Sequence, residues 1–277
     1  MIYKKYLVVA SKKDKAGINI TTNLSQFRKN PLVSSMSDEA GFDFYLVEDE
    51  IIFTENLDLD KINKYDFIIF ASKHKSEKGD KSLSVHAPGN PRNAEFGGLP
   101  KKMCKTSALF QKQIFEKLNS NVKEHGLDKK YKVTLECTHH GPLIDKPCIF
   151  IEIGSSEIEW ADRKAGFIIA KTINQIIKEF KENPYNEVAV GIGGPHYCPN
   201  FNKIQLNSNI AVSHIIPQYA LPIDEEMIKQ AIENTEEEVD FVLLDYKGLG
   251  NSEQRKQVLE ILDKLYIEHK KTSEIGK

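Results

Sequence analysis

The chain has 277 residues and a formal net charge of −2, so it carries no global positive field with which to hold nucleic acid. Hydrophobic residues make up 40% and charged residues 28%, an ordinary balance for a globular protein with a large core. The sequence has no apolar run of about 18 residues, which excludes a transmembrane helix. Four scattered cysteines without a C-x-x-C pair exclude a disulfide framework and a cysteine zinc site, and they fit a reducing cytoplasm.

The first part of the chain mixes strand and helix patterns. A short apolar run at 6–10 predicts a strand, and apolar residues at helical spacing over 16–29 predict a helix. Two strand-like stretches, 42–47 and 51–54, flank an acidic tripeptide and predict a hairpin. The nearly all-apolar run at 66–72 is typical of a strand that is covered on both faces.

A long polar segment, 73–106, separates these elements from the rest of the chain. Its Gly and Pro content favours a loop, and loops of this length inside a compact domain are usually functional or disordered. We therefore expect an insertion or lid over 73–106.

Beyond residue 106, strand and helix patterns largely alternate. The expected helices cover 107–125, with Ser107 as N-cap, and 158–181, 224–235 and 252–269. The expected strands cover 133–138, 149–153, 187–192, 211–216 and 239–244. Because such alternation implies a sheet with helices on its faces, we expect one α/β domain over 1–277, with a mixed, mainly parallel sheet.

Four polar clusters stand out beside the expected strands, where open α/β sheets place their ligands. The clusters are His86 to Asn90, Glu136 with His139 and His140, Glu152 to Glu157, and Gly193 to Tyr197.

The histidines and one glutamate of these clusters suit a zinc site. Catalytic zinc sites combine two or three histidines, sometimes with a carboxylate, and leave a position for water. His86, His139, His140, Glu152 and His196 supply this set from separate segments, without an H-E-x-x-H motif. Zinc-bound water has a pKa of about 7 and attacks ester carbonyls at neutral pH. The alternative needs no metal: one histidine, oriented by a glutamate, acts as general base on water.

The neighbours of these candidates leave alternatives open. His139 and His140 cannot face the same way if the strand continues, so one could ligate while the other packs behind it. Glu152 lies within an apolar strand, where a carboxylate needs a partner, whereas Glu136 could point to solvent.

Other polar residues near these segments are assigned structural roles. Ser155 or Ser156 is expected to cap a helix rather than to act as a nucleophile, and Cys137 and Cys198 to fill buried space. His74, His125, His214 and His269 lack comparable surroundings, and we assign them to the scaffold or the surface.

The long polar segment also carries basic residues, among them Lys101, Lys102 and Lys105. One interpretation is a solvated lid. The other is a patch that grips phosphates and whose hold on nucleic acid weakens with salt. Further along the chain, the backbone N–H groups of Gly193 and Gly194 could stabilise the oxyanion that develops during ester hydrolysis.

Four segments in one order carry a family resemblance: His86-Ala-Pro-Gly-Asn90, Thr138-His-His-Gly-Pro142, Ile151-Glu-Ile-Gly-Ser-Ser156 with Glu159-Trp160, and Gly193-Gly-Pro-His-Tyr197. Together they resemble the archaeal and plant type of D-aminoacyl-tRNA deacylase, over nearly the whole chain. The resemblance implies a zinc-dependent esterase that frees D-amino acids from tRNA. It also implies a fold similar to a blend of peptidyl-tRNA hydrolase and purine nucleoside phosphorylase.

We therefore hypothesise a cytoplasmic ester hydrolase that acts on tRNA carrying a D-amino acid, as a monomer without a stable protein partner. His139, His140 and His196 would hold zinc, with His86 as an alternative ligand or catalytic residue. Glu152 would be a ligand or the base that orients the attacking water.

Three further groups complete this hypothesis. Asn90 and the amides of Gly193 and Gly194 would hold the carbonyl oxygen, and the three lysines named above would contact acceptor-stem phosphates. One alternative is an enzyme with another substrate, related to peptidyl-tRNA hydrolase or nucleoside phosphorylase. A second alternative is a non-catalytic RNA-binding module with a structural metal, against which the negative net charge counts.

Overall fold

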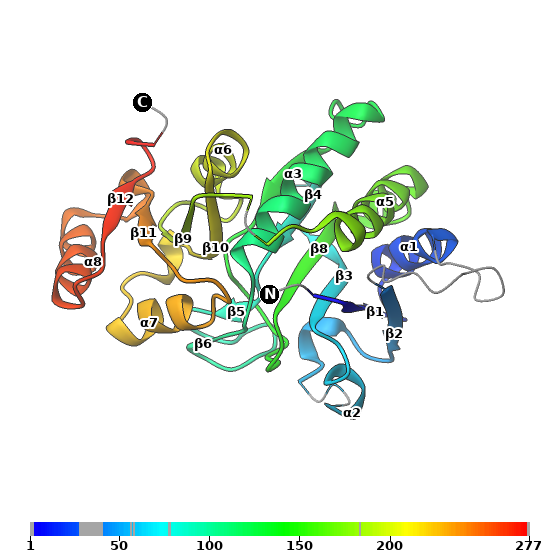
Figure 1. Ribbon diagram of the computed structural model, residues 1–277, viewed down its shortest axis with the longest axis horizontal. Coiled ribbons are helices and arrows are strands. Elements are labelled where there is room, and N and C mark those ends of the chain that lie inside the picture. Colours follow the sequence, from blue (N-terminus) through cyan, green and yellow to red (C-terminus); the bar gives the residue numbers. More distant parts are fainter. Residues whose placement is uncertain are drawn as a thin grey trace.

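The computed structural model describes residues 3–27, 41–55, 57, 59–76, 79–182 and 184–275, and it contains two neighbouring sheets (Figure 1). The larger sheet has the strand order β2-β1-β3-β8-β4-β7. Its strands are β1 (Lys5–Ser11), β2 (Gly41–Val47), β3 (Phe67–Lys75), β4 (Ser82–His86), β7 (Lys132–Leu135) and β8 (Cys148–Ser155). All neighbours pair in parallel except β4 and β8, which are antiparallel.

The smaller sheet has four parallel strands in the order β10-β9-β11-β12. These are β9 (Glu187–Ile192), β10 (Ile210–Ile216), β11 (Phe241–Leu244) and β12 (His269–Lys271). A short antiparallel pair, β5 (Gly89–Asn90) and β6 (Lys102–Met103), lies in the connection that follows β4. The mixed, mainly parallel α/β architecture expected from the sequence is confirmed.

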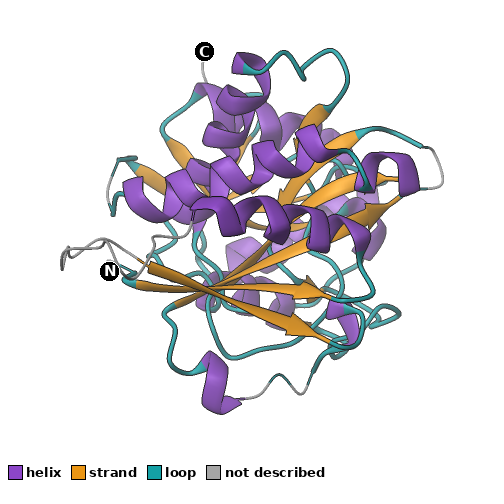
Figure 2. Ribbon diagram, turned by 90° about the vertical axis from the view of Figure 1, so that its right-hand side faces the viewer, coloured by secondary structure: helices purple, strands orange, loops and turns teal. Residues whose placement is uncertain are grey.

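Long helices cover one side of the strands, as Figure 2 shows. In Figure 1, α3 runs over the region between the two sheets, α5 lies beside α3, α1 lies beside α5, and α7 and α8 flank the smaller sheet. The bounds are α1 (Lys15–Leu24), α2 (Leu59–Ile62), α3 (Ala108–Glu124), α4 (Glu157–Trp160), α5 (Arg163–Glu179), α6 (Pro199–Asn207), α7 (Glu225–Glu233) and α8 (Ser252–Lys264). Short 3-10 turns occupy Ser25–Phe27, Ile51–Phe53, Gln218–Ala220 and Tyr246–Gly248.

Side-chain caps fix where the helices near the larger sheet begin. The Asp14 carboxylate accepts hydrogen bonds from two backbone N–H groups at the start of α1. Ser107 caps α3, as expected, and Asp162 caps α5. Each cap satisfies backbone donors that the first turn leaves unpaired, which is worth about 1 kcal/mol.

One hydrophobic cluster joins the two sheets through α3. Phe110 and Phe115 of α3 are fully buried in a cluster that also contains Ile69 of the larger sheet and Val212 and Phe241 of the smaller one. Truncating a buried aromatic such as Phe110 to alanine would cost about 3–5 kcal/mol. The helix α3 therefore contributes to the packing of both sheets. The assignment of 1–277 to a single domain stays a prediction. Within the described residues, no helix is long and apolar enough to cross a membrane.

Three expectations about the elements were wrong. The expected hairpin is absent, because β2 pairs in parallel with β1 and residues Ile51–Phe53 form a 3-10 turn. The expected helix over 158–181 is two helices, since Asp162 begins a new one. The segment 73–106 is not one long loop: β3 continues to Lys75, and β4 lies within the larger sheet, between β8 and β7. Residues 77 and 78 of that segment lie outside the described part of the chain.

Candidate active site

Strand register brings three polar side chains to one face of the larger sheet. Glu152 on β8 pairs with Ser72 on β3 and with Ser84 on β4. Residues two apart on a strand share a face, so His74 and His86 project on the same side as Glu152. The Glu152 Oε2 atom is 3.7 Å from His74 Nδ1 and 3.5 Å from His86 Nε2. The antiparallel direction of β4 places these two histidines on opposite sides of the carboxylate.

The segment after β7 connects this face to the smaller sheet. The backbone N–H of Glu136 donates to Val85 in the larger sheet, and that of Thr138 donates to Ile215 in the smaller one. Between them, the N–H of Cys137 donates to the carbonyl of His196, in the loop that follows β9. The histidines predicted from separate segments therefore meet at the junction of the two sheets.

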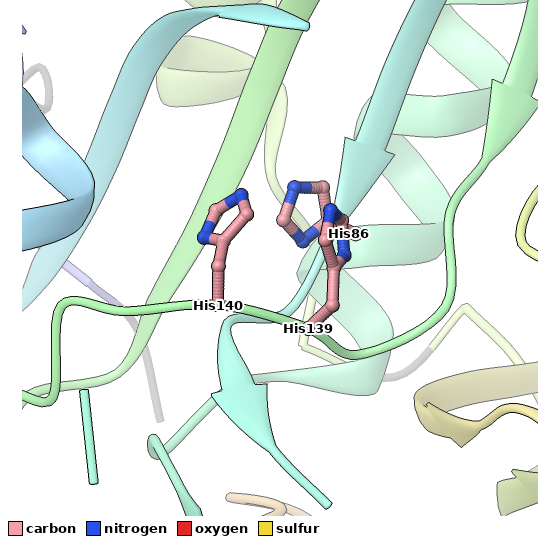
Figure 3. A group of neighbouring side chains, drawn as sticks. All are labelled: His86, His139 and His140. Carbon is pink, nitrogen blue, oxygen red and sulfur yellow. The ribbon is translucent and has the colours of Figure 1, made fainter. Parts of the chain in front are cut away.

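Both adjacent histidines of this segment join the site. The expectation that they would diverge assumed a continuing strand, but β7 ends at Leu135. His140 has φ of 47°, in the left-handed region, and this turn of the backbone brings its ring beside His139. The two ring centroids are 4.3 Å apart, and His86 lies 4.3 Å from His139 (Figure 3).

We call His86, His139 and His140 the imidazole triad. In each ring, Nδ1 lies within hydrogen-bond distance of a backbone carbonyl: Ala87 at 3.2 Å, Cys137 at 2.8 Å and Gly141 at 2.7 Å, respectively. A carbonyl only accepts, so Nδ1 must carry the proton and Nε2 keeps its lone pair. The triad offers ligand atoms that all lie within 4.8 Å of one another.

A second group lies beside the triad, and we call it the acid-linked group: His74, Glu136 and His196. The Glu136 carboxylate is fully buried, with Oε1 at 3.1 Å from His74 Nδ1 and Oε2 at 3.1 Å from His196 Nε2. The ring of His139 connects the two groups, because its Nε2 is 3.5 Å from Glu136 Oε2. His74, Glu136 and His196 also form a set of possible metal ligands.

The two groups differ in charge. Burial lowers the pKa of His140 to about 4 and that of His139 well below its ordinary range, and the neighbouring imidazoles add to this effect. Burial acts in the same direction on His74, but Glu136 and Glu152 outweigh it and raise the pKa of His74 to about 11. Burial is likewise outweighed at His196, where Cys137 and Glu136 raise the pKa to about 10.

Both glutamates are ionised at neutral pH. Burial favours the neutral acid, but His74 and His196 hold the pKa of Glu136 well below its ordinary range. Burial also opposes ionisation of Glu152, but the neighbouring rings of His74 and His86 outweigh it and lower the pKa of Glu152 to about 2. The site therefore combines two buried carboxylates, two protonated histidines and neutral imidazoles.

Sequence reasoning missed His74 and undervalued Glu136. His74 was assigned to the scaffold or surface, yet its side chain is buried and contacts both carboxylates. Glu136 does not point to solvent, since only 1% of the residue is exposed. The available signal for His74 was its position just past a buried apolar strand, the same signal that selected the other histidines. His214 is also buried, but it bonds Thr138 and Cys104 away from the carboxylates.

Two residues that touch the acid-linked group were not predicted either. The Tyr197 hydroxyl is 3.0 Å from His74 Nε2, which leaves only Nδ1 of that ring facing Glu136. The Cys137 sulfur is 3.5 Å from His196 Nδ1 and 3.1 Å from the Tyr219 hydroxyl, so this thiol is more than buried filler. Cys198 is fully buried and bonds the His196 carbonyl, as a structural residue would.

The expected oxyanion donors already have partners. The amide of Gly193 donates to Ile216 at 2.8 Å, and that of Gly194 donates to Gly248 at 3.0 Å. Asn90 is buried beside the His140 loop, but its amide nitrogen donates to the Gly97 carbonyl at 2.8 Å. The single backbone N–H groups of Gly193 and Gly194 are therefore not free to hold a carbonyl oxygen in this arrangement, which corrects the role expected for them, whereas the second N–H of the Asn90 amide leaves its expected role a prediction.

The remaining expected groups also have local partners. Lys101 and Lys105 form exposed ion pairs with Asp224 and Asp145, each at 2.6 Å, and Lys102 is exposed on β6. Ser156 stands at the N-cap of α4, but its hydroxyl donates to Glu159 instead of capping the backbone.

Comparison with known proteins was made against this geometry. A family profile described as D-aminoacyl-tRNA deacylase matches residues 61–270. The chain belongs to the D-aminoacyl-tRNA deacylase family. It is 33% identical over 261 residues to the D-aminoacyl-tRNA deacylase of Methanocaldococcus jannaschii, covering 92% of this chain and 94% of the relative. It is 35% identical over 282 residues to that of Archaeoglobus fulgidus, covering 98% of each.

A solved structure has the same fold. The crystal structure of AF0625, described as a conserved protein of unknown function, aligns with a TM-score of 0.85 and 32% identity over 98% of this chain and 96% of the other. Membership of the deacylase family confirms the expected enzyme class, ester hydrolases, over a non-catalytic RNA-binding module.

Proposed function

We propose that this chain hydrolyses the ester bond of D-aminoacyl-tRNA with the help of zinc held at the junction of the two sheets. The observation that carries the proposal is the imidazole triad, in which three Nδ1 atoms are anchored on carbonyls and three Nε2 atoms converge. Anchoring the outer nitrogen on a carbonyl is how proteins fix the tautomer of metal-binding histidines.

The donor atoms of the site fit a zinc ion. His86 Nε2 and Glu136 Oε1 are buried without a hydrogen bond in proper geometry, although Glu136 Oε1 is 3.1 Å from a His74 nitrogen. Such atoms are costly to bury unless something binds them. Neutral imidazole and carboxylate oxygen are both common zinc ligands.

The described residues contain four overlapping sets of possible metal ligands. Two are the imidazole triad and the acid-linked group, and the other two are Cys137 with His139 and His196, and His86 with Glu136 and Glu152. Of these, the triad offers three neutral imidazoles, whereas the histidines of the acid-linked group would first have to lose a proton. The triad contains His139 and His140 from the expected ligand set and adds His86, whereas His196 belongs with Glu136 and His74. Bound there, zinc would lower the pKa of a water molecule to about 7, which supplies hydroxide at neutral pH.

The chain's own residues handle the proton and the substrate. Glu152 is ionised and lies between His74 and His86, so its Oε2 can accept a proton from water and orient the attacking oxygen. With zinc on the imidazole triad, His196 stays protonated beside Glu136, and its side chain, 31% exposed, could give a proton to the leaving ribose oxygen.

The metal-free mechanism cannot use His74 or His196 as its general base. Their pKa values are raised to about 11 and about 10, so both are protonated at neutral pH. Its candidate base is His139, which is neutral and lies 3.5 Å from Glu136, so the chelator test described next separates the two mechanisms.

Release of labelled tyrosine from D-tyrosyl-tRNA, with L-tyrosyl-tRNA as control, tests the reaction. We expect release of the D form only, and equal release of both or of neither would overturn the proposal. Elemental analysis of untagged protein tests the metal, and activity that survives chelators in a zinc-free sample would remove it. His139→Ala and His196→Ala should each abolish turnover in a folded protein, and a wild-type rate in either would exclude that residue.

A further inference from the structure

A groove of about 850 Å³ lies beside the candidate active site, between α1 and the turn that connects α4 to α5. All of its ionisable lining residues are cationic: Lys12, Lys13, Lys15 and Arg163. Apart from Ile18 and Ala161, the other lining residues are uncharged and polar. The four cationic groups favour an anionic ligand, while the aliphatic stems of the lining side chains make most of the groove's surface apolar.

Hydrogen bonds hold the walls of the groove in place. The side-chain amide of Asn19 on α1 donates to the carbonyls of Trp160, at 3.0 Å, and Asp162, at 2.9 Å. The α1 helix is thereby tied to the start of α5, and the positions of Lys15 and Arg163 are set relative to each other. A ligand that enters this groove does not need to order its walls, which reduces the cost of binding.

One residue links the walls of the groove to the candidate active site. The indole N–H of Trp160 donates to the backbone carbonyl of His74 at 3.1 Å, and Trp160 is almost fully buried. Its chain neighbour Ala161 lines the groove. The groove therefore lies one buried side chain away from the backbone of His74, whose ring contacts both carboxylates.

The lysines of the groove can exchange their present carboxylate partners for phosphate groups. All three groove lysines have carboxylate partners: Lys12 pairs with Glu48, Lys13 with Asp49 at 2.7 Å, and Lys15 with Glu157. The lysine side chains are nevertheless 52%, 60% and 65% exposed. Exposed ion pairs of this kind contribute little, so a phosphate can replace the carboxylate without a large penalty. Lysine and arginine that neutralise phosphates release counterions, and this release drives much of nucleic-acid binding.

We propose that this groove binds the phosphate backbone of the tRNA acceptor arm while the aminoacyl end occupies the histidine site. The inference rests on the proposed function, because it takes aminoacyl-tRNA as the substrate. It moves the phosphate contacts from Lys101, Lys102 and Lys105, the surface expected from the sequence, to Lys13, Lys15 and Arg163.

The test compares two triple variants that each lose three cations. The groove variant is Lys13→Gln with Lys15→Gln and Arg163→Gln, and the matched control is Lys101→Gln with Lys102→Gln and Lys105→Gln. Each variant is assayed with D-tyrosyl-tRNA and with 3′-O-(D-tyrosyl)adenosine, which carries the ester but has no acceptor arm. Binding of uncharged tRNA is measured separately at several salt concentrations, and thermal unfolding checks that both variants fold.

The groove variant should raise the KM for D-tyrosyl-tRNA roughly tenfold or more and flatten the salt dependence of tRNA binding. Its kcat, and its rate on the adenosine ester, should match wild type. The control should change KM less than about twofold. A KM shift in the control variant only, or equal shifts in both, would overturn the inference. So would loss of activity on the adenosine ester in the folded groove variant.

The binding measurement separates this inference from the proposed function. If the wild-type protein releases no D-tyrosine, the proposed reaction fails. Weaker tRNA binding by the groove variant alone would still support the groove as the RNA surface. If hydrolysis is D-specific and tRNA binding is the same in wild type and the groove variant, the reaction stands and the inference fails.

Discussion

The two halves of the site contain the same residue type in opposite states. In the imidazole triad, burial and the neighbouring rings keep His139 and His140 neutral. In the acid-linked group, Glu136 outweighs burial, together with Glu152 at His74 and Cys137 at His196, and both rings stay protonated. Burial favours the neutral ring in both halves, so the difference comes from the partners. A carbonyl partner leaves burial dominant, whereas a carboxylate creates a cation that must lose its proton before it can bind metal.

Of the changes considered, replacing Glu136 with glutamine should have the largest effect, because it removes the charge that distinguishes the acid-linked group from the imidazole triad. His196 would lose its counter-charge, and its pKa would fall because burial then dominates. We expect turnover to fall by about 10²–10⁴-fold together with loss of bound zinc. Rates of D-tyrosine release, elemental analysis and the titration of the His196 ring by NMR measure the three effects.

Glu237→Gln is a suitable control for that variant. Glu237 also accepts hydrogen bonds, from Ser107 and the first turn of α3, but it lies outside the site. A similar loss of activity in both variants would show that Glu136 matters only for the fold.

Tyr197→Phe should have a smaller effect than Glu136→Gln, and it should affect the acid-linked group but not the imidazole triad. The hydroxyl of Tyr197 fixes His74 Nε2, so its loss would leave that ring free to turn while the triad keeps its carbonyl anchors. Removing an outer partner of this kind typically lowers metal affinity 10–100-fold. Competition with a zinc chelator gives the affinity without relying on turnover, and an unchanged affinity would remove Tyr197 from the site.

The stability of zinc-free protein should depend on pH in opposite ways for the two halves. His140 has a folded pKa of about 4, below its ordinary 6.5, so its contribution is present above pH 6.5 and lost as pH falls toward 4. His74 has a folded pKa of about 11, so its contribution is present below pH 6.5 and lost as pH rises toward 11.

Denaturant unfolding with a chelator present, across this pH range, resolves the two contributions. His140→Asn should flatten the acid side of the stability profile, and His74→Asn should flatten the alkaline side. Profiles parallel to wild type in both variants would mean that the halves do not differ in protonation.

The smallest effect is expected for His269→Ala. His269 stands on β12, at the edge of the smaller sheet, and belongs to neither half. Its activity and zinc content should stay within about twofold of wild type, since surface substitutions rarely have large effects. A large loss in this variant would show that histidine content alone, and not the arrangement at the junction, affects the assays.

The local elements could be predicted from the sequence more fully than the site. The Ser107 cap and the apolar runs at β3 and β8 depend on neighbouring residues, and they were found. The extension of β3 could not be found in this way. Lys73 remains in the strand because its ammonium reaches Glu50, and His74 because its ring meets two carboxylates from other strands.

The same limit applies within the site. His139, His140, Glu152 and His196 were selected because each lies beside Gly, Pro or a strand end. The burial of Glu136 depends on His74 and His196, which come from different sheets and cannot be related by spacing. The occupied amides of Gly193 and Gly194 depend on Gly248 and Ile216 in the same way.

The position of β4 has a consequence for synthesis of the protein. Both of its neighbours, β7 and β8, come later in the chain, so β4 leaves the ribosome before either partner exists. The nascent sheet is at first only β1, β2 and β3, with a free edge at β3 where β8 will pair. His86 and Glu152 face each other only once residues up to β8 have emerged, and His196 arrives later still. A growing polypeptide can therefore bring the imidazole triad together once β8 has emerged, but it lacks the complete candidate site until more than two thirds of it has been translated.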